Sequence, residues 1–153
     1  NPKKDTSHLL EERDRKRVEI GKERKDDSPL REAYLQGNDL LVYTIVLNYL
    51  IACEELFWKP ASPTSYITRT VGIQALFDIL RTRVAREAYS DKQISVQDFL
   101  RRLEPARSLD FSDAQFVNAS GTGRSMIRRA IETAMAAESD EATESSRDMP
   151  TRS

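Results

Sequence analysis

One short segment contains the residue types that bind a phosphate group. The run Ser120-Gly121-Thr122-Gly123-Arg124-Ser125 comes directly before an amphipathic stretch, so it would form the entrance to a helix. Two glycines let the backbone approach a ligand closely, and the free amides of a first helical turn attract an anion. Arg124 would add positive charge. The candidate phosphate-binding or DNA-binding residues are Ser120, Gly121, Thr122, Gly123, Arg124, Ser125, Arg128 and Arg129.

This segment departs from a Walker A loop at two positions. Asn118 stands where the first glycine of that motif would be, and Arg124 replaces its lysine. An ordinary glycine-containing turn before a helix is a competing interpretation. The alternative hypothesis is a nucleotide-phosphate-binding enzyme, with a metal placed by a carboxylate near Glu54 or Asp78.

The chain offers few other groups for catalysis. Its single histidine, His8, lies in a charged segment that would not hold it rigidly, which excludes a histidine-based triad. Its single cysteine, Cys53, lies in the most apolar segment, where burial raises the pKa of a thiol and makes it inert. No E-x-x-H motif accompanies the acidic residues Glu54, Glu55 and Asp78. We therefore expect no catalytic residue, no metal site and no cofactor, and leave the enzyme hypothesis open only as the alternative.

Composition divides the chain into three parts. The 153 residues are 39% hydrophobic and 32% charged, with a formal net charge of −1, so any attraction to nucleic acid must be local. Residues 1–37 form a charged arm, in which 17 of the 25 residues from Lys3 to Asp27 are lysine, arginine, aspartate or glutamate. Residues 38–137 contain the apolar periodicity of a helical domain. Residues 138–153 have too few apolar side chains to fold, which predicts a disordered tail.

The most apolar segment is LLVYTIVLNYLIACEELFW, residues 40–58. Its apolar residues cover every side of a helical wheel, which predicts a central helix enclosed by other elements. A membrane span is the competing interpretation, because the length is close to the ~20 residues that a bilayer requires. Asn48, Glu54 and Glu55 interrupt the segment, so we expect no membrane insertion.

The remaining periodicity predicts an all-α domain. Two long antiparallel helices are expected over residues 39–58 and 66–88, with shorter helices near 96–104, 112–117 and 124–137. The arm is expected to be disordered or to form a single helix. Either Asn38 or Asp39 is expected to cap the helix that follows, and Ser95 with Asp98 resembles a capping box. Gly72 would allow the two long helices to approach closely.

A resemblance to a known family covers most of the packed region, from about Asp39 to Glu132. It rests on NYLIACEELFWKP (48–60), YITRTVGIQALFDILR (66–81) and ASGTGRSMIRRAI (119–131), of which TVGIQALFDIL is the most specific. These stretches resemble the C-terminal part of DGQHR-domain proteins, which look akin to the DndB-type proteins encoded with bacterial DNA phosphorothioation and phage-defence genes. The DGQHR motif itself is absent from the chain, so no residue here takes over its role. The resemblance also implies that the chain is a C-terminal fragment or a truncated gene product.

Residues and resemblance together lead to one functional expectation. The chain would be a non-catalytic helical interaction domain of a bacterial, cytoplasmic protein linked to DNA modification or phage defence. It would contact the DNA backbone, through Arg124, Arg128 and Arg129, or a defence-system protein. Arg101, Arg102 and Arg107 could extend the basic surface, and a homo-oligomer is possible.

Overall fold

The computed structural model describes residues 7–22, 28–117 and 122–147. These residues contain helices and no strand, which confirms the all-α class. The α-helices are α1 (Ser7–Lys22), α2 (Arg31–Leu35), α3 (Asp39–Cys53), α4 (Thr70–Ile79), α5 (Ala85–Asp91), α6 (Val96–Leu103) and α7 (Thr122–Arg147). Shorter turns are the π-helical η1 (Glu54–Trp58) and η3 (Leu80–Val84) and the 3-10 turns η2 (Tyr66–Thr68), η4 (Glu104–Ala106) and η5 (Ala114–Phe116).

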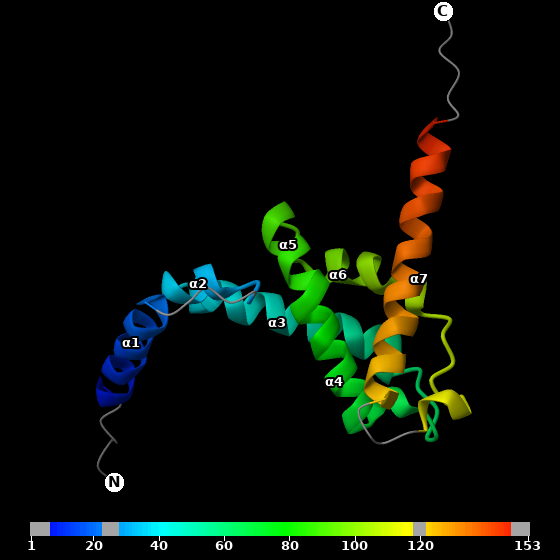
Figure 1. The fold of residues 1–153 in the computed structure, drawn as a ribbon, viewed down its shortest axis with the longest axis horizontal. Coiled ribbons are helices and arrows are strands. Elements are labelled where there is room, and N and C mark those ends of the chain that lie inside the picture. The colour runs from blue at the N-terminus through cyan, green and yellow to red at the C-terminus, as the bar shows by residue number, and fades with distance from the viewer. Residues whose placement is uncertain (1–6, 23–27, 118–121, 148–153) are drawn as a thin grey trace, which may run out of the picture.

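The helices gather at one end of α3. α6 packs against α3 and α7 packs against α4, whereas α1 and α2 lie at the N-terminal end of α3 (Figure 1). The predicted long helices therefore do not form the main antiparallel pair. α3 and α4 instead cross, and the Tyr49 hydroxyl of α3 donates a hydrogen bond of 2.7 Å to the Leu76 carbonyl of α4.

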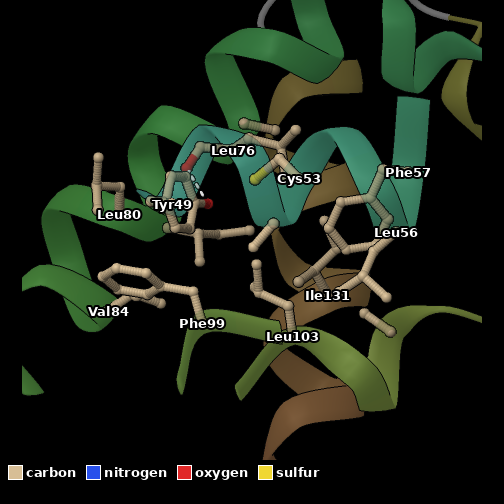
Figure 2. Packing of buried hydrophobic residues seen from close by; sticks show 14 of the residues in the cluster. Tyr49, Cys53, Leu56, Phe57, Leu76, Leu80, Val84, Phe99, Leu103 and Ile131 are labelled. Atoms are coloured by element: carbon tan, nitrogen blue, oxygen red, sulfur yellow. Dashed lines mark hydrogen bonds between the residues drawn. The ribbon is translucent and has the colours of Figure 1, made fainter. Parts of the chain in front are cut away.

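One core connects α3, α4, α6 and α7. Figure 2 shows Tyr49 and Cys53 of α3 facing Leu76 of α4, with Phe99 and Leu103 of α6 and Ile131 of α7 closing the cluster. The Tyr49 and Phe99 rings meet edge to face, with centroids 5.8 Å apart. Asn48, which interrupts the apolar segment, donates from Nδ2 to the Ile94 carbonyl at 2.8 Å. The polar group in this helix is thus satisfied by the segment that leads into α6.

The prediction that residues 40–58 are enclosed on every side is wrong for the first half of α3. Leu40 is 75% exposed and Tyr43 is 62% exposed, while Ile45, Tyr49 and Cys53 are fully buried. The reason is that, among the described elements, α1 and α2 lie at that end of the helix and leave Leu40 and Tyr43 uncovered. Length and apolar composition alone make Asp39–Trp58 a candidate membrane-spanning helix, a test that the core helices of globular proteins also pass.

The helix expected over residues 66–88 is interrupted. Tyr66–Thr68 form a 3-10 turn, Arg69 is extended (φ −92°, ψ 168°), and α4 begins at Thr70. The Tyr66 amide donates to the Phe111 carbonyl, which holds this turn away from the helix axis. Gly72 therefore approaches the backbone of Tyr66 and Ile67, and our explanation that it packs against α3 is wrong. The helical path then continues through η3 and α5 to Asp91. The next residue, Lys92, adopts a left-handed backbone conformation and caps the helix.

Two other boundaries differ from the prediction. The segment near 112–117 forms only the 3-10 turn η5. Phe111 before this turn and Phe116 at its end are both buried, and the Asp113 side chain accepts a hydrogen bond from the Gln115 amide. α7 continues to Arg147, ten residues beyond the expected end at 137. Adding residues to an existing helix costs little, and Ala and Glu are favourable helix formers. Residues 148–153 of the predicted tail lie outside the described residues.

Within the predicted arm, residues 1–37, the structure describes two helices, α1 and α2, so the expectation of disorder or a single helix is wrong. Arg17 attaches α1 to the domain. Its side chain is only 8% exposed. The guanidinium forms an ion pair with Asp39 at the start of α3 and lies 4.9 Å over the Tyr34 ring of α2. Of the two candidates for the first cap, Asn38 accepts from the Leu41 amide, whereas Asp39 is the first residue of α3. The predicted capping box of Ser95 and Asp98 is confirmed.

Candidate functional site

The central polar feature of the domain is an ion pair between α4 and α7. Arg124, in the first turns of α7, donates from Nε to Oδ2 of Asp78 at 2.5 Å and from Nη2 to Oδ1. Such two-point contacts are the strongest geometry available to a guanidinium and a carboxylate. Asp78 is only 7% exposed, so this arginine is oriented by a buried partner.

The surroundings of Asp78 are positively charged. The hydrogen bonds from Arg124 lower the pKa of the Asp78 carboxyl, against the opposing effect of burial, and the charges of Arg124, Arg128 and Arg81 lower it further. The same pairing raises the pKa of the Arg124 guanidinium. Both groups are therefore charged at neutral pH, and Asp78 is a poor candidate for a general acid or base.

An open groove of about 790 Å³ lies beside this ion pair. α3 contributes Val42 and Val46 to its lining, and α4 contributes Phe77 and Asp78. The remaining lining residues are Ser28, Pro29, Leu30, Arg31, Tyr34, Leu80, Arg81, Ala85 and Arg124. The groove thus has mainly apolar walls with charged groups at a few defined positions, the usual character of a binding site.

Phe77 is the most unusual residue of the groove. It is a large apolar side chain in the middle of α4, yet it is 44% exposed. Burying such a side chain gains roughly 1.5–3 kcal/mol relative to full exposure. Part of that free energy remains available to a partner that covers Phe77.

A π-helical turn forms one end of the groove. In η3 the Ala85 amide bonds to the Leu80 carbonyl, five residues earlier, which widens the helix between α4 and α5. Leu80, Arg81 and Ala85 all line the groove. Single π-helical turns inside α-helices often coincide with functional sites, because the wider turn redirects side chains.

The structure describes only part of the predicted phosphate segment. Ser120 and Gly121 lie outside the described residues. Thr122 is exposed at the start of α7, and Gly123 is buried. Ser125 is half-buried and has an interaction partner. Arg124 is directed to Asp78, so its charge is already shared with a carboxylate.

Most of the other predicted arginines also have acidic partners. Arg128 lies 3.8 Å from Glu132, Arg101 pairs with Asp98, and Arg107 pairs with Glu104 at 2.8 Å. Arg102 connects α6 to α5 through Glu87 and Asp91, each at 3.1 Å. Only Arg129, among these candidates, is an exposed arginine for which the described residues provide no ion pair. The positive charge available to a DNA backbone is therefore smaller than the sequence suggests.

The nucleophile and carboxylate candidates are placed apart. Cys53 is fully buried, and burial raises the pKa of its thiol to about 12. Glu55 pairs with Lys59 on its own turn, while Asp78 faces Arg124. In the described residues no group of three or more histidine, cysteine or acidic side chains is close enough to hold a metal ion.

Among the groove residues, the sequence singles out only Arg124 and Asp78. Val42 and Val46 lie in a segment that is apolar throughout, so nothing distinguishes them there. Phe77 does carry a signal, because Ile73 and Phe77 repeat at a spacing of four on the side of α4 away from its buried positions. Arg81 follows Phe77 at the same spacing.

Comparisons with protein-family models, with curated proteins and with solved structures give no match to this chain.

Proposed function

We propose that this chain is a non-catalytic helical interaction domain, and that the groove beside Asp78 and Arg124 binds an α-helical segment of a partner protein. The observation that carries the proposal is the exposure of Phe77 in the wall of a groove that is mainly apolar and carries charged groups at a few positions. An amphipathic helix that lays its apolar face into such a groove is a common mode of peptide recognition.

The charge distribution favours a protein partner over a DNA backbone. DNA binding depends on lysines and arginines that neutralise phosphates. Here Arg101, Arg102, Arg107 and Arg124 each form an ion pair within 4 Å of a carboxylate. Binding of these arginines to phosphates would break their ion pairs with carboxylates. Covering the exposed Phe77 side chain would break no ion pair.

Display selection of helical peptides tests the proposal. Peptides are selected on the wild-type protein, and their affinities are then measured for Phe77→Asp and for the control Ile73→Asp. Both side chains are partly exposed on α4, but only Phe77 lines the groove. We expect Phe77→Asp to weaken binding by about tenfold or more, as loss of an interface anchor does, and Ile73→Asp to retain affinity. Equal binding by all three proteins, or no enriched peptide, contradicts the proposal.

The biological setting of this function is a separate proposal, which rests on the sequence resemblance alone. If TVGIQALFDIL and its neighbours reflect kinship with DGQHR-domain proteins, the partner belongs to a bacterial DNA-modification or phage-defence system in the cytoplasm. A titration of duplex DNA at low salt, repeated with Arg129→Ala, tests direct DNA contact. Salt-dependent binding that Arg129→Ala reduces would support it, and absence of binding would remove it.

A further inference from the structure

We propose that the segment bound in this groove is an acidic amphipathic helix, whose carboxylates lie along the edge that carries Arg81. The inference rests on the proposed function and specifies the chemistry of the partner.

The groove has an excess of positive charge. Its lining contains three arginines, Arg31, Arg81 and Arg124, and one carboxylate, Asp78. Arg124 and Asp78 neutralise one another through their two-point contact. Arg31 has an interaction of its own, so Arg81 carries the positive charge that remains at this edge.

Arg81 is the residue best placed to meet a carboxylate. It is exposed, and the described residues provide it with no ion pair. It stands one helical turn after Phe77, in the π-helical turn η3. A bound helix that covers Phe77 would thus place its flank beside this guanidinium. The Arg81 guanidinium would repel lysine or arginine side chains on that flank and would attract carboxylates.

A second hollow on the protein shows that this charge excess is particular to the groove. That hollow, beside α6, is lined by two carboxylates, Glu55 and Glu104, and by two arginines, Arg101 and Arg107. Its charges balance. The net charge of the whole chain is −1, so long-range attraction does not favour an acidic ligand either. A preference for acidic peptides would have to arise locally.

Two synthetic helical peptides test the inference by fluorescence anisotropy. They share one leucine face at positions i, i+3, i+4 and i+7, and differ in flanks of glutamate or lysine. We expect the glutamate peptide to bind about tenfold more tightly at low salt, and added salt to reduce the preference. Arg81→Ala should remove most of this preference and Arg81→Glu should reverse it. Arg129→Glu changes the net charge equally but lies outside the groove lining, so it should leave the preference intact.

The outcomes separate the two proposals. If both peptides bind equally, or if the lysine peptide binds better, the acidic-partner inference is overturned. The acidic-partner inference is also overturned if Arg129→Glu changes the preference between the two peptides as strongly as Arg81→Glu does. In each case the groove keeps its function provided that Phe77→Asp abolishes binding. If neither peptide binds and display selection also fails, the proposed function itself is overturned. Circular dichroism of each variant confirms that the helical fold is retained.

Discussion

Asp78 and Arg124, 46 residues apart in the chain, meet in a two-point ion pair that joins α4 to the first turns of α7. The arginine that the sequence offers to a phosphate is therefore already bound to a buried carboxylate. The same pair lines the groove, so it both holds α7 in place and limits the charge that a ligand encounters.

The first prediction concerns the pH dependence of this pair. Hydrogen bonds from Arg124 lower the pKa of Asp78 below its ordinary value of 3.8. As the pH falls, the unfolded chain therefore binds a proton at Asp78 before the folded chain does. The stabilisation from the Asp78 charge is complete above the unfolded pKa and is lost as the pH falls through the lower pKa of the folded state. Asp78→Asn should reduce the free energy of unfolding at neutral pH, and the difference from wild type should shrink toward about pH 3.

Urea unfolding across this pH range provides the measurement. Arg124→Lys serves as a companion variant, because it keeps the charge but loses the two-point geometry. A deficit in Asp78→Asn that stays constant from neutral to acid pH would show that the Asp78 charge contributes no stability.

Local sequence signals predicted local structure well. Ser95 and Asp98 bond to one another across three residues, so their capping box follows from spacing alone. Spacing predicted a cap at Asn38 or Asp39, and Asn38 forms it through the Leu41 amide. Cys53 lies in the densest apolar run and is buried as expected.

Features that depend on distant neighbours could not be predicted. The partner of Arg124 is 46 residues away, and one positive side chain has many possible carboxylates. The exposed half of α3 shows the same limit, because apolar composition cannot reveal how much protein is available to cover Leu40 and Tyr43. The groove also combines residues from elements far apart in sequence, such as Val46 and Phe77.

The second prediction concerns Gly72. A Cβ at this position would lie 2.4 Å from the Ile67 Cα and from the carbonyl oxygens of Tyr66 and Ile67, all of them backbone atoms that cannot yield easily. Gly72→Ala should destabilise the protein by about 1–3 kcal/mol, although alanine is ~1 kcal/mol better than glycine inside a helix. Chemical denaturation measures the change, with the exposed Gln74→Ala on α4 as the neutral control. A stabilised Gly72→Ala would contradict the close approach.

The third prediction concerns the crossing of α3 and α4. The Tyr49 hydroxyl is buried and donates to the Leu76 carbonyl, so Tyr49→Phe removes one hydrogen bond while keeping the ring that contacts Phe99. We expect a loss of about 0.5–1.5 kcal/mol in the free energy of unfolding. Tyr43→Phe, at an exposed position on α3, should change it by less than about 0.5 kcal/mol. Equal effects of the two substitutions would argue against the buried hydrogen bond.

The fourth prediction concerns how α1 is held. Arg17 contacts Asp39 and lies over Tyr34, whereas Lys16 pairs only with Glu12 on its own helix. Arg17→Ala should therefore increase amide hydrogen exchange in α1 without raising exchange in the α4 and α7 core, and Lys16→Ala should have little effect. Unchanged protection of α1 in Arg17→Ala would show that other contacts hold the helix.

The most direct test of the central claim is an NMR titration of the protein with the glutamate-flanked helical peptide. If the groove is the binding site, the largest amide shifts should arise at Val42, Val46, Phe77 and Arg81, which line it. Phe77→Asp should abolish these shifts, and Ile73→Asp should preserve them. Shifts centred on the hollow beside α6, or a spectrum that does not change at saturating peptide, would contradict the account.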